Sequence, residues 1–558
     1  MNRCTCLFLL TCLTHVLFSQ KPELVKDINP TGGANIEFLT PFKGKVYFSA
    51  DDGIHGKELW TSDGTEQGTY MVKDIHSSGS SGPIDLLAVG DHLFFVAHDN
   101  EGHGYELWVS DGTETGTVLV KDIRPGTPHS DVQSLTQFGD RIIFAANNGV
   151  DGNEIWISDG TDPGTFLLKN IAPGASSSSP HYMSLVNGKI YFQADHPDFG
   201  TELWISDGTA SGTQLLKDIY PGAASSDLSN FHSHYHQIDG IFYFSARDKT
   251  HGYELWKTDG TTVGTQLIKD IRPGDLGSGP VHLRDFNGNL YFNGTGPNGI
   301  EVYVSDGTSS GTQLLKDIQS GGHSSPSGFF GYMGFLYFWA HQSGTGRELW
   351  RTDGTTAGTS LFKDFNPGTL NGISENNNLD YFIRYKNLMY FLAEDGSNGT
   401  ELWVFDELGD SLYKIMPDIA PNSDPVKFGS AFRGFAKANG LLYFSANYTT
   451  DGLELYKVKD TTMVTSVEPQ LLRDQIQLFP NPVFEQKFTV QYTTRRSCDI
   501  QLSVIDQTGR TIVQISPQFK APGTHEVLVQ LPASIPTGIY WLSIQANGKN
   551  HGLPLLVR

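Results

Sequence analysis

Short segments rich in carboxylate, amide and imidazole side chains recur along the chain, and these groups could bind a polar ligand or a cation. Pairs such as Asp51 with Asp52, and Glu394 with Asp395, could supply oxygen ligands to Ca²⁺, which takes about six to eight of them. No such segment contains a complete Asp-x-Asp-x-Asp-Gly loop, so solvated turns are the simpler interpretation. The candidate residues for ligand binding are Asp51, Asp52, His55, Asp99, Asn100, Asn147, Asp151, Asp195, His196, Asp248, His251, Glu394 and Asp395.

Three histidines alternate along one segment, at His232, His234 and His236. A β-strand would place their imidazoles on one side, where they could hold Zn²⁺ or Cu²⁺. No carboxylate or cysteine completes this set locally. The sequence also lacks His-Glu-x-x-His, Gly-x-Ser-x-Gly and phosphate-binding Gly-Lys-Ser/Thr motifs, so no motif indicates catalysis. We therefore assign no catalytic residue and expect no required cofactor, with Ca²⁺ as the candidate cation.

The elements that must position these residues are sequence repeats. The motif Glu-Leu-Trp-x-Ser/Thr-Asp-Gly-Thr-x-x-Gly-Thr, followed by Lys-Asp-Ile, begins at Glu58 and returns at intervals of 47 to 53 residues. A period in this range is typical of a β-propeller or a repeat array rather than of several unrelated domains. The repeat glutamates are Glu58, Glu106, Glu154, Glu202, Glu254, Glu301, Glu348, Glu401 and Glu454.

Each repeat is long enough for four short strands. In the second repeat, residues 84–89, 93–97, 106–109 and 118–123 are β-rich runs separated by Gly, Asp and Asn. No stretch beyond the first twenty residues shows a sustained apolar period of about 3.6 residues, which a helix would need. The sequence therefore predicts an all-β fold.

The two ends of the repeat region complement each other. Residues 23–28 match the fourth strand of a repeat but have no repeat before them, whereas the last repeat, residues 441–457, lacks its fourth strand. We predict that the first strand fills this vacancy, which closes the ring and removes its open sheet edges. Counting every repeat gives about nine four-stranded blades. Eight is the alternative, because residues 405–408 and Pro417 depart from the repeat pattern.

The residues common to the repeats predict structure rather than chemistry. An aromatic residue in the tryptophan position of every repeat is expected to wedge between adjacent sheets. Counting across the Asp-Gly turn places the first seven of these glutamates, Glu58 to Glu348, opposite the lysine 15 residues later. We therefore expect Glu58 to form a cross-strand ion pair with Lys73, and Glu454 to meet Lys26 across the ring closure.

Function is expected where the repeats differ from one another. In a four-stranded blade, the loop between the second and third strands lies on the same face as the crossover to the next blade. The candidate ligand-binding residues occupy the first set of loops, and the crossovers are rich in Pro, Gly and Ser. Because loops on a rigid scaffold commonly carry binding, we predict that this face binds a ligand.

Composition indicates an exported protein. Residues 1–20 contain one basic residue and an apolar core, residues 7–18, as a secretory signal peptide does. Three of the four cysteines lie in this segment, so only Cys498 would remain after cleavage and no intrachain disulfide could form. The net charge of −22 argues against nucleic acid or an anionic membrane as a partner. No later segment is long and apolar enough to predict a transmembrane helix.

The repeats are followed by a second domain. We place the repeat domain at residues 21–460, a polar linker at 461–475 and the second domain at 476–558. Several strand patterns in the second domain, separated by turns such as 506–509, predict a small Ig-like β-sandwich.

Two resemblances follow from these motifs. Residues 23–460 resemble the ELWxxDGT-repeat proteins, a family without a well-defined activity to transfer. The second domain resembles the C-terminal sorting domain of the type IX secretion system, through residues 478–482, 506–510 and 538–540. That resemblance implies Sec-dependent export in a Gram-negative bacterium, recognition by the outer-membrane translocon, and release or attachment to surface lipopolysaccharide. The corresponding sorting-signal residues are Pro480, Asn481, Pro482, Gly509, Gly538 and Tyr540.

Together these patterns predict a secreted or cell-surface β-propeller that binds an extracellular glycan or protein in adhesion. One alternative is a hydrolase or lyase acting on extracellular polysaccharide through loop carboxylates such as Asp51, Asp99 and Asp195. The other is a structural component of the cell surface.

Overall fold

The chain is seen in a computed structural model that describes residues 22–557 with several gaps. The gaps are residues 229–234, 374–381, 387, 397–399, 407–410, 416–433, 447–451, 460–476, 480–482, 484–485, 495–497, 507–509, 521–522 and 547–548. The chain divides into two compact units, a larger one of Ser19–Glu407 and Ser411–Lys459 and a smaller one that contains Asp460–Arg558.

Within the described residues, the larger unit consists of nine four-stranded antiparallel sheets. Their first strands are β2 (Glu37–Phe42), β6 (Ile84–Val89), β10 (Gln133–Phe138), β14 (His181–Val186), β18 (Tyr235–Ile238), β22 (Val281–Phe286), β26 (Ser327–Tyr332), β30 (Ile383–Tyr385) and β34 (Phe435–Ala438). The second strands are β3 (Lys45–Asp51), β7 (His92–Ala97), β11 (Arg141–Asn147), β15 (Lys189–His196), β19 (Ile241–Asp248), β23 (Asn289–Gly296), β27 (Phe335–Gln342), β31 (Leu388–Glu394) and β35 (Leu441–Ala446). The third strands are β4 (Lys57–Ser62), β8 (Glu106–Ser110), β12 (Asn153–Ser158), β16 (Gly200–Ser206), β20 (Gly252–Thr258), β24 (Gly299–Ser305), β28 (Gly346–Thr352), β32 (Thr400–Asp406) and β36 (Glu454–Val458). The fourth strands are β5 (Tyr70–Lys73), β9 (Val118–Lys121), β13 (Phe166–Lys169), β17 (Gln214–Lys217), β21 (Gln266–Lys269), β25 (Gln313–Lys316), β29 (Ser360–Lys363), β33 (Ser411–Lys414) and, in the last sheet, β1 (Glu23–Lys26).

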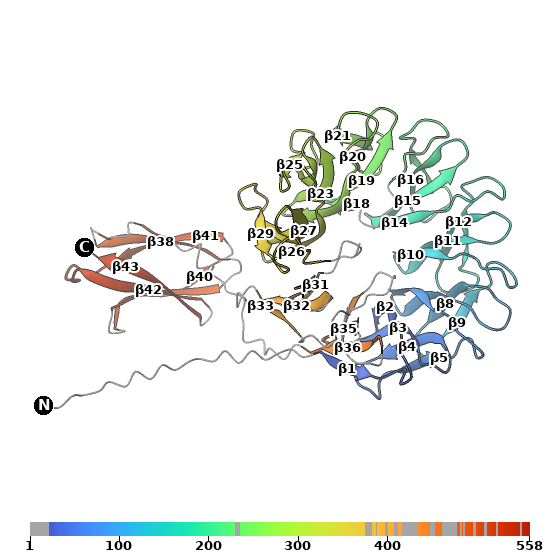
Figure 1. The fold of residues 1–558 in the computed structure, drawn as a ribbon, viewed down its shortest axis with the longest axis horizontal. Helices are drawn as coiled ribbons and strands as arrows, with labels where there is room; N and C mark the ends of the chain where they lie inside the picture. The colour runs from blue at the N-terminus through green and yellow to red at the C-terminus, as the bar shows by residue number, and fades with distance from the viewer. Residues whose placement is uncertain are drawn as a thin grey trace. The chain divides into compact units, whose positions relative to one another are not determined.

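The sheets form the blades of a β-propeller. First strands such as β10, β14 and β18 lie toward the centre of the ring, and fourth strands such as β5 and β21 lie at its rim (Figure 1). Strand β1 pairs antiparallel with β36, with Leu24 opposite Tyr456, and so completes the ninth blade. The predictions of an all-β propeller and of closure by the first strand are confirmed, with nine blades rather than eight among the described residues.

Each blade is buried on both faces by its neighbours, which explains the continuous apolar runs of the second strands. In β7, Phe94 packs into a cluster with Ile142 of the third blade, while the next residue, Phe95, packs into a cluster with Tyr47 of the first blade. Both phenylalanines are fully buried. Successive side chains of a strand point to opposite faces, so a strand covered on both sides needs an apolar residue at every position.

The repeat tryptophans lie between adjacent blades, as predicted. Trp108 of the second blade packs with Phe42 and Tyr47 of the first, and Trp156 of the third blade packs with Phe94 of the second. The buried indole Nε1 atoms have no hydrogen-bond partner in the described part of the chain, so these rings contribute apolar packing. These nitrogens belong to Trp60, Trp108, Trp156, Trp204, Trp256, Trp350 and Trp403.

The predicted ion pair between each repeat glutamate and lysine is wrong. A β-bulge between Leu59 and Trp60 shifts the register, so that Leu59, not Glu58, faces Lys73. The Lys73 ammonium instead donates to the carbonyl of Thr117 in the next blade, at 2.8 Å. Lys26 faces Leu455 and donates to Thr69 O at 2.8 Å, so it does not meet Glu454.

The repeat glutamates instead hold the crossovers between blades. The fully buried Glu154 accepts hydrogen bonds from the backbone N–H groups of Ile171, Ala172 and Ser178, at 2.7, 3.1 and 3.0 Å, and from the Ser178 hydroxyl at 2.6 Å. Glu454 binds the backbone of Ile28 and Ala34 in the same way. Each carboxylate thus satisfies donors of a buried loop that has no ladder partner.

The smaller unit contains two sheets. One has the order β37 (Gln477–Phe479), β38 (Lys487–Thr494), β41 (Gly523–Gln530). The other has the order β40 (Thr511–Lys520), β39 (Cys498–Ile505), β42 (Gly538–Ala546), β43 (Lys549–Val557). Val490 and Tyr492 of the first sheet share one buried apolar cluster with Leu502, Leu542 and Leu555 of the second. Two sheets around one core have the architecture of the predicted β-sandwich.

Candidate functional site

The loops between second and third strands meet the crossovers between blades on one face of the propeller, which we call the loop face. In the first blade, Gly82 N of the crossover donates to Lys57 O at 3.0 Å. In the second, Ser130 N donates to Tyr105 O at 3.1 Å, and Asn100 Nδ2 donates to Ser77 Oγ at 2.8 Å. The two sets of loops therefore form one continuous surface in these blades.

Three loops of this face share a turn closed by an aspartate and a histidine. Asp52 Oδ1 accepts the backbone N–H groups of Ile54 and His55, and its Oδ2 lies 2.7 Å from His55 Nδ1. The hydrogen bond that His55 makes to the Asp52 carboxylate raises the pKa of His55. Burial acts to raise the pKa of Asp52, but the hydrogen bonds from His55 and Ile54 outweigh it and lower that pKa. The corresponding pairs are Asp99 with His103 at 2.8 Å and Asp248 with His251 at 2.7 Å.

The third blade uses amides where the others use histidine. Asn147 Oδ1 accepts the N–H of Gly149 at 2.8 Å. Asp151 accepts from Asn148 Nδ2 at 2.8 Å and from Asn170 Nδ2 of the crossover at 3.0 Å. The predicted residues of this loop thus stabilise their own turn and join it to the crossover.

Most of the remaining predicted loop residues have partners close to them in the chain, whereas Asp395 pairs with Lys414 of the fourth strand. The structure therefore distributes the predicted residues over several loops, where most of them close the turn of their own loop, rather than gathering them in one shared cluster. The contacts are Asp51 Oδ1 with Gly53 N at 2.8 Å, Asp195 Oδ1 with Thr201 Oγ1 at 2.5 Å, His196 Nδ1 with Asp198 N at 3.1 Å, Glu394 Oε1 with Thr400 Oγ1 at 3.0 Å and Asp395 Oδ2 with Lys414 Nζ at 2.7 Å.

One group in the described chain has the spacing of cation ligands. Ligand atoms of Asp99, Glu101 and His103 lie within 4.8 Å of one another. Asp99 also accepts the N–H groups of Glu101 and His103, so the turn itself accounts for this cluster. Three protein ligands, one of them an imidazole, fit the all-oxygen preference of Ca²⁺ poorly.

The predicted histidine cluster lies only partly within the described residues. His232 and His234 fall in the gap at residues 229–234. His236 lies on β18, and its Nε2 is 2.7 Å from Asp285 Oδ1 of the next blade. That ring nitrogen is engaged in an inter-blade contact.

Sequence analysis missed two stacks of planar side chains on the loop face. In the second blade, the ring of His98 lies 4.9 Å from that of His76 and 4.6 Å from that of Tyr105, both edge to face. Burial lowers the pKa of His98, and the neighbouring His76 lowers it further. Each stack joins residues that are far apart in the sequence, so only the fold reveals it.

The second stack lies in the fifth blade. The Arg247 guanidinium lies 5.5 Å from the Tyr220 ring centroid and 5.8 Å from that of Tyr253. Its charge is paired with Asp227 at 2.7 Å. The three planar groups are partly exposed.

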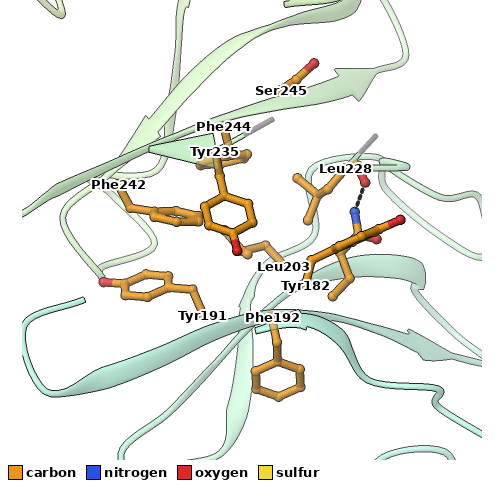
Figure 2. Close-up of a pocket in the computed structure, with 10 residues that line it drawn as sticks. Tyr182, Tyr191, Phe192, Leu203, Leu228, Tyr235, Phe242, Phe244 and Ser245 are labelled. Atoms are coloured by element: carbon orange, nitrogen blue, oxygen red, sulfur yellow. Dashed lines mark hydrogen bonds between the residues drawn. The ribbon is translucent and has the colours of Figure 1, made fainter. Parts of the chain in front are cut away.

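A small pocket of about 30 Å³ lies between the fourth and fifth blades. Figure 2 shows the rings of Tyr182, Tyr191, Tyr235 and Phe242 gathered around it, with the Tyr235 hydroxyl directed between the two blades. Tyr191 and Phe242 also belong to the apolar cluster that joins these blades. Leu228 and Tyr235 flank residues 229–234, which are outside the described residues, so we assign no site here.

Comparison with known proteins identifies the smaller unit. Residues 477–556 match the family model of the secretion system C-terminal sorting domain. The chain therefore carries a type IX sorting domain, which implies recognition by that secretion system and a secreted or outer-membrane surface location. Gly538 pairs with Val557, and the Tyr540 hydroxyl donates to Pro536 O at 2.9 Å, whereas Pro480, Asn481, Pro482 and Gly509 lie outside the described residues.

Solved structures similar to the chain include a puromycin hydrolase and an oligopeptidase. A puromycin hydrolase is 14% identical with a TM-score of 0.34, over 74% of this chain and 58% of that one. Oligopeptidase B from Leishmania major is 11% identical with a TM-score of 0.35, over 64% and 50%. The chain thus spans less than two thirds of either protein, and a likeness at this level says nothing of what the chain binds. No curated protein matches the sequence.

The described residues contain no helix long and apolar enough to cross a membrane.

Proposed function

We propose that this protein is an exported β-propeller whose loop face binds an extracellular glycan or protein in adhesion. The observation that carries the proposal is a contrast between two sets of residues in the repeat, those that recur in the repeats and those that vary from blade to blade. The residues that recur in the repeats make structural contacts, as Trp108 and Glu154 do, whereas the loop face carries residues that differ from blade to blade. Side-chain variety on a rigid scaffold is the usual arrangement of a binding surface.

The geometry favours binding over hydrolysis of a polysaccharide. A glycosidase needs two carboxylates about 5–10 Å apart across the bond that it cleaves. Asp51, Asp99 and Asp195, the candidates for that role, each accept hydrogen bonds from their own loop. These contacts keep the carboxylates in their turns, which supports a role in shaping the loops.

The export route completes the proposal. We propose that residues 1–20 are removed as a signal peptide, that residues 21–460 are the exported cargo, and that residues 461–475 link it to the sorting domain at 476–558. This division supports display of the loop face outside the cell, where the ligand would be met.

An array of glycans and matrix proteins, probed with the full chain, tests the proposed function. We expect binding that is lost when residues 99–103 and 248–251 are replaced by Gly-Ser linkers on the loop face. The control is Glu114→Ala, an exposed change in a turn between third and fourth strands. Because the acidic cluster suits Ca²⁺ poorly, EDTA should leave binding unchanged. No ligand on the array, or equal losses in the control, would contradict the proposal.

A further inference from the structure

The two planar stacks occupy the same three positions of their repeats. The first position follows Lys-Asp-Ile in the incoming crossover, the second follows the alanine of the second strand, and the third precedes the repeat glutamate. These positions hold His76, His98 and Tyr105 in the second blade, and Tyr220, Arg247 and Tyr253 in the fifth. No other repeat has an aromatic residue at the third position.

The backbone connection at the crossover does not require these rings. In the fourth blade the first and third positions hold Ala172 and Thr201. Ser226 N still donates to Thr201 O at 3.0 Å there, just as Ser130 N donates to Tyr105 O at 3.1 Å in the second blade. The same backbone connection thus forms without a ring, although Tyr105 also packs against the apolar cluster between the second and third blades and lies 5.0 Å from the His129 ring. The part of each tyrosine that stays exposed is not explained by the crossover.

Each stack also encloses an aspartate–histidine turn. Asp99 and His103 lie in the chain between His98 and Tyr105, and Asp248 and His251 lie between Arg247 and Tyr253. The face thus offers, at two equivalent places, flat rings beside carboxylate, imidazole or guanidinium groups.

We propose that the stacks in the second and fifth blades are two equivalent subsites for the sugar rings of a neutral glycan. This inference rests on the proposed function and names the ligand class. The apolar C–H face of a pyranose packs on an aromatic ring, while its hydroxyls exchange hydrogen bonds with polar groups at the edge of that ring. A net charge of −22 disfavours an anionic polysaccharide.

The charges of the stacks agree with a neutral ligand. Burial lowers the pKa of His98, which favours the neutral form of that ring. Arg247 is paired with Asp227, so its charge is already balanced. The blades are three steps apart in a ring of nine, so a branched or long glycan could occupy both subsites and gain avidity.

Titration calorimetry of the full chain with neutral gluco-, manno-, galacto- and xylo-oligosaccharides tests the proposal. For the oligosaccharide that binds, we expect two sites per chain. Tyr105→Thr and Tyr253→Thr should each weaken one site by about tenfold or more, and the double variant should lose both. Threonine is chosen because Thr201 occupies the same repeat position in the fourth blade, so the backbone tolerates it.

Two further variants separate loss of the ring from loss of the fold. Tyr105→Phe keeps the ring and should retain binding to within about threefold. Tyr70→Thr removes an exposed tyrosine from the rim strand β5 and should bind as the unaltered chain does. If the double variant binds neutral glycan normally, or if the chain binds only proteins on the array, the subsites are refuted while the proposed function stands. If the unaltered chain binds neither glycans nor proteins, the subsites and the proposed function are both refuted.

Discussion

The buried carboxylate at each crossover makes a quantitative prediction about stability. In Glu154→Ala, the backbone N–H groups of Ile171, Ala172 and Ser178 lose their acceptor at a site from which solvent is excluded. Each orphaned donor costs about 1–3 kcal/mol, so the upper limit for three is about 9 kcal/mol. Water entering the vacated space can bind some of these groups, and one buried carboxylate is removed. We therefore expect a net loss of about 3–5 kcal/mol in the free energy of unfolding.

Chemical denaturation followed by circular dichroism would measure this loss, and amide hydrogen exchange would locate it. Exchange should accelerate first at Ile171, Ala172 and Ser178. The matched control is Lys169→Met. Lys169 Nζ donates to Thr213 O at 2.5 Å, so its removal should cost only about 0.5–1.5 kcal/mol. A loss below about 1 kcal/mol for Glu154→Ala, or equal losses for the two variants, would refute the crossover role.

Three further predictions follow from the same contacts. First, burial raises the pKa of four repeat glutamates to about 7, above the value near 4.5 expected in the unfolded chain; they are Glu106, Glu202, Glu348 and Glu454. The folded state then binds more protons than the unfolded state, so the melting temperature should fall as pH rises from about 5 to 8; a flat or rising curve would contradict this. Second, His55, His103 and His251 should protonate at higher pH than a free imidazole, because each is bonded to an aspartate, whereas burial lowers the pKa of His282 to about 4. NMR titration of the ring nitrogens checks this order, and an inverted order would show that the turns are not formed. Third, Trp156→Ala should lower the free energy of unfolding by about 3–5 kcal/mol, but Trp156→Phe by less than about 1.5 kcal/mol, because the indole nitrogen has no partner among the described residues. Equal losses in thermal denaturation would mean that the nitrogen matters.

Much of the propeller could be predicted from the sequence because its signals are local and repeated. The blade count follows from the repeat period, and the closing strand follows from the orphan segment at residues 23–28. The tryptophan wedge follows from one aromatic residue in a fixed position of every repeat. In each case the same pattern recurs in several repeats, so an interpretation made for one repeat can be checked against the others.

The partner of the repeat glutamate could not be predicted by counting across the turn. That count assumes a regular ladder, and one bulge between Leu59 and Trp60 moves Lys73 onto Leu59. A single inserted residue turns the following side chains to the other face of the sheet. The ion pair inferred from a regular register therefore does not form.

The candidate site also could be predicted only in part, because its contacts join residues that are far apart in the sequence. Topology correctly placed the second-to-third loops and the crossovers on one face. The stacks, however, join residues such as His76 and Tyr105 from separate loops, and no local motif links them. The one available signal was the tyrosine before the repeat glutamate, which occurs in two repeats.

The pairing of β1 with β36 also sets the order in which the molecule can assemble. Glu454 bonds to Ile28 across 426 positions of the chain, so the ninth blade cannot form until nearly all of the propeller has emerged from the ribosome. Closing so long a loop is slow and entropically costly, which makes this step a late event in folding. Until then both ring ends expose unpaired strand edges that can aggregate. Ring closure by β1 is therefore the step that removes these edges.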